Sequence, residues 1–401
     1  MSVPSSFWLD TPYTSRSSLH SREIGDLAVI GAGITGIASG IFMAEAGYPP
    51  IILEGETVAS GASGRNAGFL IAGTAEYYSR TVESLGGQKA SRLWQLSLQS
   101  HDQVEAWVER FGLKCDHQRH GSLVLAESET ELEEITAAAE MLISDGFPAD
   151  MVSREDLDAW GTCLSSFHGG YFAEPDGVIN PVAFIRGLAG QLEEMGGRIY
   201  EHSPVHGIRE TRDGTVLIET DQGEVESQRV LVATNGYVSG LHEMLAGKVE
   251  PVRGQMLATD PADTRLTVPC YANFGYDYFR QLSDNRLLVG GMRDSKPEAE
   301  KGYERKTTEP IQHELENYLK RLLDSHGIPN ITHRWAGIMG FSVDGLPIVG
   351  RIPARSNVFT AAGFTGHGMS IAPKIADIAA SLLVEGEHPD SSLFSIRRFL
   401  N

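Results

Sequence analysis

A glycine-rich turn near the start of the chain constrains the fold more than any other feature. The apolar run Leu27-Ala28-Val29-Ile30 is followed by glycines at 31, 33 and 36 and then by a helix-like apolar run. A second apolar run, 51–53, ends in Glu54, 18 residues after the third glycine. A strand, a Gly-x-Gly-x-x-Gly turn, a helix and a strand ending in a carboxylate form the dinucleotide-binding fingerprint. The sequence therefore predicts an α/β fold with a Rossmann-like domain, in which Glu54 accepts hydrogen bonds from a ribose.

Each position of the turn has a physical role. Gly31 permits the tight turn, Gly33 lets the backbone approach a pyrophosphate, and Gly36 lets the helix pack closely on the strand. The amides at the start of the helix, at Ile34 and Thr35, are then available to phosphate oxygens.

Composition excludes several classes of partner. The 401 residues can bury a large core and form two domains. The net charge is −20 and no basic cluster stands out, so neither nucleic acid nor an anionic membrane surface is an expected partner. No apolar run is long enough for a membrane span, and the first 25 residues lack the apolar stretch of a signal peptide. Cys115, Cys163 and Cys270 show neither disulfide nor metal-ligand spacing, which predicts no metal site and a reducing, cytoplasmic location.

Periodicity outlines the remaining elements. Helices are predicted at 87–111, 129–144, 181–194, near 308–325 and at 368–384, and strands at 118–126, 346–350, 358–361 and within 198–234 and 249–341. Asp213-Gly214 indicates a hairpin. This order favours a discontinuous dinucleotide-binding domain with an inserted antiparallel-sheet substrate domain. The predicted boundaries are an N-terminal leader at 1–25, the dinucleotide-binding domain at 26–85, 150–240 and 342–401, and the substrate domain at 86–149 and 241–341. We expect the aromatic residues of the leader to pack on the body.

Two further glycine-rich segments are candidate ligand contacts. The small residues of 59–68 let the backbone approach a ligand closely. At 361–369, an apolar strand runs into a turn that opens a helix. The positive end of that helix suits an anion or an electron-rich ring, although the glycines are equally consistent with a simple helix cap.

Six motifs, taken in order, resemble the D-amino-acid oxidase-like flavoproteins, a family that includes glycine oxidase, sarcosine oxidase and gamma-glutamylputrescine oxidase. The motifs are the 31–36 turn with its preceding strand, Glu54, the 61–68 loop, 232–236, 335–337 with 344–347, and 363–368. They cover 27–383. The Arg-Asn-Ala-Gly form of the 61–68 loop is most similar to the gamma-glutamylputrescine oxidase branch.

The resemblance implies a Rossmann-like FAD-binding domain and a set of cofactor contacts. Glu54 matches the residue that binds the adenosine ribose, Val205 matches a strand residue that meets the adenine, and 366–369 face the flavin pyrimidine. The implied FAD-binding residues are Gly31, Gly33, Ile34, Thr35, Gly36, Glu54, Ser63, Arg65, Asn66, Ala67, Gly68, Val205, Ala233, Gly236, Gly337, Ile338, Gly363, Gly366, His367, Gly368 and Met369. Gly337 stands where sarcosine oxidase has its flavin-linked cysteine, so we expect FAD to be bound non-covalently.

The resemblance also implies a reaction. The flavin would take a hydride from a C–H beside an amine nitrogen, and water would hydrolyse the resulting imine. The substrate would be an amine or amino acid, and the electron acceptor oxygen or an unknown partner. Leu288 stands where sarcosine oxidase has an oxygen-activating lysine, while Ser370 and Met339 stand near positions that bind a carboxylate in relatives. These departures favour a secondary amine, a polyamine derivative or a larger amino acid.

Four residues are candidates for catalysis, namely Arg65, Tyr278, Arg280 and His367. Arg65 lies in the small-residue segment 59–68, which we call the flavin loop, and either contacts the cofactor or active site or pairs with an acid. Arg280 either clamps a substrate carboxylate or forms a rim ion pair. Tyr276 and Tyr278, two apart on a predicted strand, point the same way and either line a cage or pack the sheet. His367 either transfers a proton or only presents its backbone.

Two other functions remain open from the sequence. A flavin-binding subunit could hold FAD structurally or relay electrons in a larger assembly. An NAD(P)H-dependent flavin reductase or hydroxylase would normally carry a second nucleotide fingerprint, and the sequence shows no second Gly-x-Gly-x-x-Gly after a strand.

Overall fold

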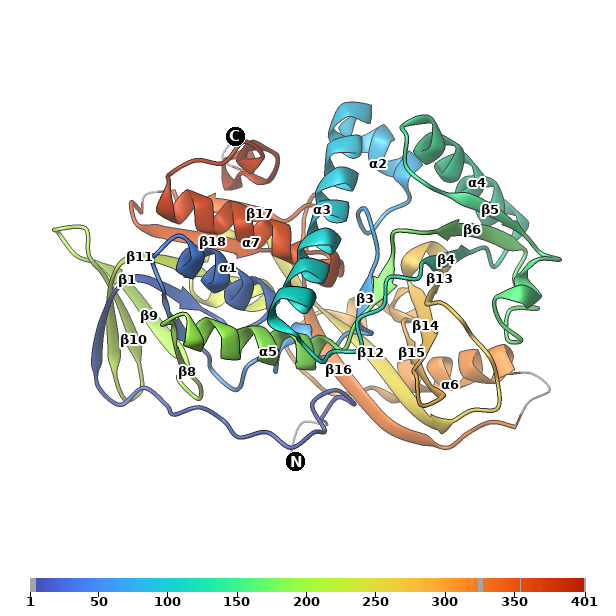
Figure 1. The fold of residues 1–401 in the computed structure, drawn as a ribbon, viewed down its shortest axis with the longest axis horizontal. Coiled ribbons are helices and arrows are strands. Elements are labelled where there is room, and N and C mark those ends of the chain that lie inside the picture. Colours follow the sequence, from blue (N-terminus) through green and yellow to red (C-terminus); the bar gives the residue numbers. More distant parts are fainter. Residues whose placement is uncertain (1–4, 324–326, 354, 400–401) are drawn as a thin grey trace.

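The first of two large sheets is built around the glycine-rich turn. The computed structural model describes residues 5–323, 327–353 and 355–399 (Figure 1). The strand order is β17 (Ile348–Arg351), β18 (Val358–Ala362), β11 (Glu224–Val232), β1 (Arg22–Ile30), β2 (Ile51–Leu53) and β8 (Arg198–Tyr200). Neighbours from β18 to β8 are parallel, as in a Rossmann-type sheet. The α/β class and the Rossmann-like domain are therefore confirmed.

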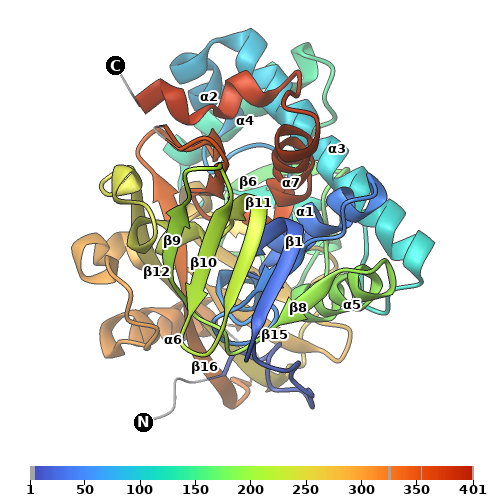
Figure 2. The ribbon, with the colours of Figure 1, turned by 90° about the vertical axis from the view of Figure 1, so that its left-hand side faces the viewer.

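A hairpin extends this sheet. β9 (Val205–Glu210) and β10 (Val216–Thr220) pair antiparallel, and β10 pairs with β11. Figure 2, which views this side of the molecule, shows β9, β10, β11 and β1 side by side. The connection between β9 and β10 contains Asp213-Gly214, so the hairpin is confirmed.

The second sheet is almost wholly antiparallel. Its order is β16 (Ile331–Ser342), β12 (Val249–Pro261), β15 (Arg286–Gly290), β14 (Asp277–Gln281), β13 (Cys270–Ala272), β4 (Ser122–Leu125), β6 (Gly169–Ala173) and β5 (Asp150–Ser153). Only the β13–β4 pair is parallel. The long β12 and β16 strands run through the centre of the molecule in Figure 1. A two-stranded sheet joins β3 (Phe69–Leu70) to β7 (Gly177–Val178).

The sheet partition differs from the predicted boundary at residue 150. β5 and β6 lie in 150–173, which we assigned to the dinucleotide-binding domain, yet β6 pairs with β4 and β5 pairs with β6. Those strands therefore belong to the second sheet. The division of the chain into domains remains a prediction.

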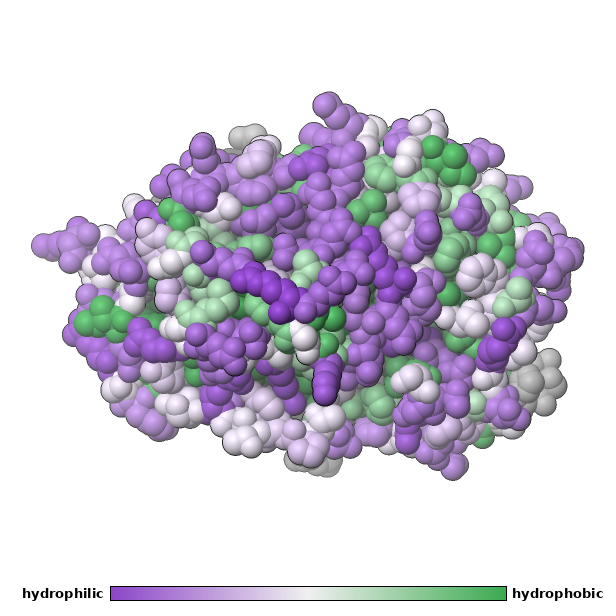
Figure 3. Space-filling model, viewed as in Figure 1, coloured by the Kyte–Doolittle hydropathy of each residue, from purple (hydrophilic) through white to green (hydrophobic). Residues whose placement is uncertain are grey.

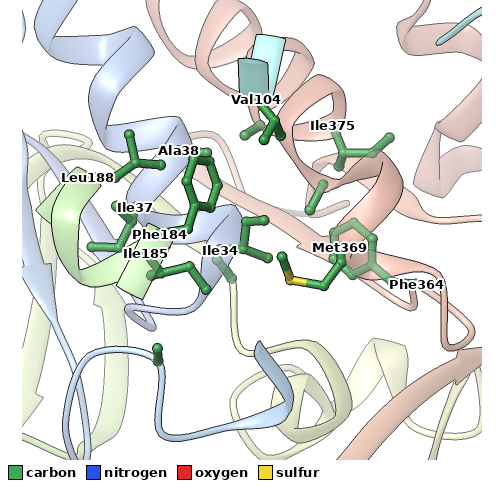
Figure 4. Packing of buried hydrophobic residues seen from close by; sticks show 14 of the residues in the cluster. Ile34, Ile37, Ala38, Val104, Phe184, Ile185, Leu188, Phe364, Met369 and Ile375 are labelled. Carbon is green, nitrogen blue, oxygen red and sulfur yellow. The ribbon is translucent and has the colours of Figure 1, made fainter. Parts of the chain in front are cut away.

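Helices cover both sheets. Beside the first lie α1 (Ile34–Glu45), α5 (Pro181–Glu194) and α7 (Gly368–Val384), and α3 (Gly87–Phe111) packs on α7. Figure 4 shows Ile37 and Ala38 of α1 packed with Val104 of α3, Phe184 of α5 and Ile375 of α7. This cluster fixes the start of α1 against the start of α7.

Capping explains where several helices begin. α4 (Glu129–Ser144) starts after Ser128, whose side chain accepts from the Glu131 amide, and α5 starts after Asn180, which accepts from Ala183. The remaining helices are α2 (Tyr78–Leu85) and α6 (Glu309–Leu323). Four predicted helices have the observed bounds; the end of the fifth, at 324–325, falls outside the described residues.

The leader packs on the body, as predicted. Trp8 is only 4% exposed, and its indole Nε1 donates to the Asn66 carbonyl at 2.7 Å. The Ser6 hydroxyl donates to the Gly64 carbonyl at 2.5 Å. The ring of Phe7 lies edge-on to His333 of β16. The leader thus covers the small-residue loop of 59–68.

The surface is mainly polar on the face shown in Figure 3, with hydrophobic residues in small, scattered patches. Of the helices in the described residues, none combines the length and the apolar character needed to cross a membrane.

Candidate active site

Backbone geometry makes glycine necessary at two positions of the β1–α1 turn. Gly31 has φ +102°, and a Cβ there would lie 2.8 Å from the Ala233 carbonyl oxygen. A Cβ on Gly36 would lie 1.9 Å from the Gly31 carbonyl oxygen. The turn is held to the sheet by the Gly31 amide, which donates to the Leu53 carbonyl at 2.8 Å. The turn, β2 and the end of β11 therefore meet at one place.

Glu54 lies directly beside this turn. Its carboxylate accepts from the amide of Ala32 at 2.8 Å and from that of Glu56 at 2.9 Å. Burial nonetheless raises the pKa of Glu54, against these two hydrogen bonds. On the other side, the Ser63 hydroxyl accepts from the Ile34 amide at 3.1 Å.

Val205 lies at the start of β9, close to the segment that follows Glu54. It follows Pro204, whose Cα would be 3.7 Å from a Cβ on Gly55. The residues predicted to hold the adenosine and pyrophosphate of a dinucleotide are thus brought together, with Thr35 in the first turn of α1.

Arg65 joins the small-residue loop to β16. Its Nε donates to the Ser60 carbonyl at 2.9 Å and its Nη1 to the Ala336 carbonyl at 3.2 Å. In return, the Trp335 indole donates to the Arg65 carbonyl at 2.9 Å. A Cβ on Gly337 would lie 2.9 Å from the Cβ of Arg65, and burial lowers the pKa of the Arg65 guanidinium.

Asn66 shapes the rest of that loop. Its amide nitrogen donates to the carbonyls of Ala62 and Ser63, and its side-chain oxygen accepts from the Gly68 amide at 2.7 Å. Ala67, which lies between Asn66 and Gly68 in the chain, is buried. These bonds fix the loop that approaches the second sheet.

The turn between β18 and α7 lies next to the end of β11 and to β16. The Asn235 side-chain oxygen accepts from the Gly363 amide at 3.0 Å, and a Cβ on Gly236 would lie 2.9 Å from the Met339 carbonyl oxygen and 3.4 Å from Ile338 Cγ2. Gly366 is exposed with φ +84°, next to Met339.

α7 begins at this turn, at Gly368 and Met369. No side chain from the described residues caps the helix, and its first turn holds no acidic residue. The Ser370 hydroxyl accepts from the Ile71 amide at 2.8 Å, which ties the helix to the strand after the loop.

These features fit a bound dinucleotide. The first turn of α1, like that of α7, contains no acidic residue, and the N-cap residues of both helices make no side-chain capping bond in the described part of the chain. Such helix ends attract negative charge. The Thr234 hydroxyl, beside Gly31, is buried and finds no hydrogen-bond partner among the described residues. A phosphate near α1 and an electron-rich ring near α7 would use these groups.

Aromatic side chains gather where the β18–α7 turn faces the second sheet. We call Phe69, Tyr271, Tyr278, Phe341 and His367 the aromatic cluster. Ring centroids are 5.3 Å apart for Phe69 and Tyr271, 5.7 Å for Tyr271 and Tyr278, and 6.2 Å for Tyr271 and His367. Phe341 Cζ would be 3.9 Å from a Cβ on Gly366. All but Phe69 are only half-buried.

Burial and one cation set the protonation of this cluster. The pKa of His367 falls to about 4, through burial first and the nearby Arg293 charge second, so the imidazole is neutral at pH 7. Its Nδ1 is buried and lacks a partner among the described residues. Burial raises the pKa of Tyr278 to about 12, although Arg293 opposes the shift.

Arg293 is a site residue that the sequence reasoning missed. It opens the 3₁₀ turn Arg293–Ser295, and its guanidinium carbon lies 4.4 Å from the Tyr276 ring centroid and 5.5 Å from that of Phe341. Within the described residues it forms no ion pair and no side-chain hydrogen bond. The available signal was an arginine two residues beyond Gly291, just after an apolar strand.

The structure also places the predicted site residues Tyr276, Tyr278 and Arg280. Tyr278 is in the aromatic cluster, whereas Tyr276 precedes β14 in helical conformation (φ −73°, ψ −31°). The expectation that both tyrosines share one strand face was therefore wrong, because the strand starts only at Asp277. Arg280 is buried farther along β14, where its Nη1 donates to the carbonyls of Ala67 and Gly68, both at 3.1 Å.

The three cysteines are buried and unpaired. Across the described ranges, no three His, Cys, Asp or Glu side chains gather in a way that could hold a metal ion.

The Rossmann-type sheet, its glycine-rich turn and Glu54 are features of dinucleotide-binding proteins, and a separate antiparallel sheet is packed beside them. Residues 26–382 match the family described as FAD dependent oxidoreductase (DAO), and the chain belongs to that family. The family resemblance and FAD as cofactor are thereby confirmed, and the protein is an FAD-dependent oxidoreductase.

Individual relatives agree. The chain is 30% identical to a probable oxidoreductase, OrdL, of Haemophilus influenzae, over 93% of this chain and 85% of that protein. It is 27% identical to gamma-glutamylputrescine oxidoreductase of Escherichia coli, over 92% and 86%. The crystal structure of glycine oxidase from Geobacillus kaustophilus superposes with a TM-score of 0.81 at 23% identity, covering 94% of this chain and 100% of that one, which shows the shared fold.

Proposed function

We propose that the protein oxidises the C–N bond of an amine that also carries a carboxylate, and that Arg293 binds this carboxylate. The observation that carries the proposal is a half-buried guanidinium, without an ion pair in the described residues, beside the rings of Tyr276 and Phe341. A guanidinium binds a carboxylate through two parallel hydrogen bonds. The names of the relatives, which include a gamma-glutamylputrescine oxidoreductase and glycine oxidases, support an amine or amino-acid substrate.

FAD, when bound, supplies the oxidising chemistry by accepting a hydride from the C–H beside the amine nitrogen, and water then hydrolyses the imine product. We propose that the β1–α1 turn, Glu54 and Ser63 hold its adenosine and pyrophosphate. The amides of 366–369, at the positive end of α7, would favour negative charge that develops on the ring. With Gly337 at the family's attachment position, the cofactor is bound non-covalently.

The chain's own side chains bind and orient the substrate. Arg293 fixes the carboxylate end, while Tyr271 and Tyr278 form an apolar wall that excludes water from the reacting carbon. His367 is neutral and can accept a hydrogen bond at Nδ1 from the substrate amine, which must be deprotonated to react. Arg65 holds the flavin loop on β16 and does not contact the substrate in this proposal.

The test is anaerobic reduction of the bound flavin by amines with and without a carboxylate, in wild type, Arg293→Met and Arg293→Lys. Loss of a charge-assisted contact predicts a fall in kcat/KM of roughly 10- to 100-fold in Arg293→Met for carboxylated amines only, with partial retention in the lysine variant. Arg321→Met on α6, which removes an exposed guanidinium paired with Glu127, is the matched control.

FAD content should be the same in wild type, the two Arg293 variants and Arg321→Met, since in this proposal Arg293 contacts the substrate and not FAD. Equal losses for amines with and without a carboxylate would contradict the assignment of Arg293.

A flavin-binding subunit that relays electrons is the second candidate. It is favoured by Leu288, fully buried on β15, where sarcosine oxidase has an oxygen-activating lysine. No flavin reduction by any amine, in a protein that retains FAD, would support this second candidate. Rapid reoxidation by air after reduction by an amine would make oxygen the acceptor and exclude it.

A further inference from the structure

A cavity lies between the leader and the ends of β13 and β14. Its volume is about 580 Å³. We call it the leader cavity; its walls include Phe7, Trp8, His120, Thr267, Arg280 and His333. Arg293 and the aromatic cluster are absent from its lining, so it is a different site from the proposed substrate site.

Arg280 contributes a buried guanidinium to this cavity. The residue is 5% exposed, and its Nη1 donates to the carbonyls of Ala67, Gly68 and Ile179 at 3.1, 3.1 and 3.3 Å. Its Nε is buried and has no hydrogen-bond partner among the described residues. Nη1 of the guanidinium therefore has all its hydrogen-bond partners from backbone carbonyls. The other side of the group, formed by Nε and Nη2, makes no hydrogen bond to the described residues.

The charge of this guanidinium is poorly compensated. It forms no ion pair within the described residues, and burial lowers the pKa of Arg280 to about 9, with only the more distant Asp116 opposing the shift. Taking a charge out of water without a counter-ion is costly. The three backbone carbonyls give Nη1 its hydrogen-bond partners, but they leave the buried Nε without one among the described residues.

A second polar atom in the same cavity is also unsatisfied. The Nδ1 of His120 is buried without a hydrogen-bond partner among the described residues. The Trp8 ring lies 5.8 Å from the guanidinium carbon of Arg280, which gives the cavity an aromatic wall. Three acids also line the cavity: Asp10 contacts His333, Asp284 pairs with Arg286, and Asp116 acts on Arg280 by its charge without forming an ion pair within the described residues.

We propose that the leader cavity binds a small organic carboxylate, held in two-pronged fashion by Nε and Nη2 of Arg280. The same guanidinium holds the carbonyls of Ala67 and Gly68, so a bound carboxylate acts on the flavin loop without touching the substrate. The inference does not rest on the proposed function, because neither Arg293 nor the aromatic cluster forms part of this site.

The test is calorimetric titration of the FAD-loaded protein with acetate, repeated while bound-flavin absorbance is recorded. In Arg293→Met, which lacks the proposed substrate clamp, one saturable acetate site should remain and should perturb the flavin spectrum. Adding Arg280→Met should weaken this site about tenfold or more. His120→Gln, which leaves Arg280 and the flavin loop intact, should weaken acetate binding and leave FAD content unchanged.

Absence of a saturable acetate site in Arg293→Met would overturn the proposal, as would a site that survives Arg280→Met. If Arg280→Met fails to retain FAD, the His120→Gln protein decides, and an unchanged acetate affinity there counts against the site. If Arg293→Met instead keeps full amine oxidation while Arg280→Met loses acetate binding, the proposed function fails and the leader cavity stands.

Discussion

At the scale of single residues, Glu54 connects the dinucleotide turn to the end of β2. Its carboxylate accepts from two backbone amides, those of Ala32 and Glu56, and we propose that it binds the adenosine ribose. Glu54→Ala should weaken FAD binding by about 1 to 3 kcal/mol through loss of charge-assisted hydrogen bonds. Fluorescence titration of apoprotein with FAD measures this. Glu23→Ala, at an exposed pair with Arg198, is the control, and wild-type affinity in Glu54→Ala would contradict the role.

Asp176 gives a pH-dependent prediction. It is 1% exposed, its oxygens accept from the Ala72 amide and the Ser122 hydroxyl, and burial raises its pKa to about 7. In the unfolded chain an Asp has a pKa of about 4. Between these values the folded protein keeps a proton that the unfolded chain has lost. The contribution of Asp176 to the free energy of unfolding is therefore full below pH 4 and falls as pH rises to 7.

Asp176→Asn removes this titration. Relative to wild type, the variant should gain roughly 1 to 3 kcal/mol in the free energy of unfolding between pH 5 and pH 8. Denaturant unfolding of both proteins at the two pH values gives this difference. Asp277, whose pKa is also raised to about 7, is present in both proteins and cancels. A difference that does not change with pH would show that Asp176 is ionised when folded.

From the sequence, candidate site residues could be named where a motif fixes the backbone, but not where the direction of a side chain decides. Gly31, Gly36 and Glu54 were named from their spacing and Ser63 from the family resemblance, and the structure brings all four together. Arg293 was missed because its position depends on a turn after β15 that carries no local pattern. The direction of its side chain is set by Tyr276 and Phe341, which are distant in the chain.

At the scale of elements, the β1–α1 turn gives a sharp test. Gly36→Ala would place a Cβ 1.9 Å from the Gly31 carbonyl oxygen, a contact that only a backbone shift can relieve. We expect the turn to open and FAD affinity to fall by about 100-fold or more, since the helix amides no longer converge on the pyrophosphate. FAD occupancy of the purified protein measures this.

Gly190→Ala is the matched control for that substitution. Gly190 lies inside α5, away from the glycine-rich turns, and no atom lies within 4 Å of a Cβ there. This variant should retain FAD, and equal losses in both variants would mean that close packing at Gly36 is not what the turn requires.

Helices were easier to predict than sheet membership. α3, α4, α5 and α7 have the predicted bounds because periodicity, caps and helix breakers are local signals. β5 and β6 lie in a segment that we assigned to the dinucleotide-binding domain, yet β6 pairs with β4, a strand far earlier in the chain, and β5 pairs with β6. Such pairing is decided by packing on a surface formed by other segments, which no local pattern records.

At the scale of the whole molecule, the flavin loop is held from three sides. Arg65 attaches it to β16, Arg280 attaches it to β14, and the leader covers it through Ser6 and Trp8. The loop has little apolar side-chain surface of its own, so its conformation depends on these contacts. Sequence predicted that the leader packs on the body, but not that its target is the cofactor loop.

Removal of residues 1–12 tests this arrangement. The deletion leaves Tyr13 and Arg16, which anchor the rest of the leader on Glu201 and Glu193. It exposes the surface beneath Trp8 and removes the hydrogen bonds to the Gly64 and Asn66 carbonyls, so both FAD affinity and thermal stability should fall. Trp8→Phe keeps most of the buried ring and loses only the Nε1 donor, a cost of about 1 kcal/mol.

The truncated protein should therefore lose more FAD on gel filtration than Trp8→Phe, and Trp8→Phe more than wild type. Added FAD should restore part of the lost thermal stability in the truncated protein, because ligand binding to the folded state raises its stability. If the truncated protein retains FAD as wild type does while its melting temperature falls, the leader stabilises the body without ordering the flavin loop. That result would separate the leader from the cofactor site and would leave Arg65 and Arg280 as the residues that hold the loop.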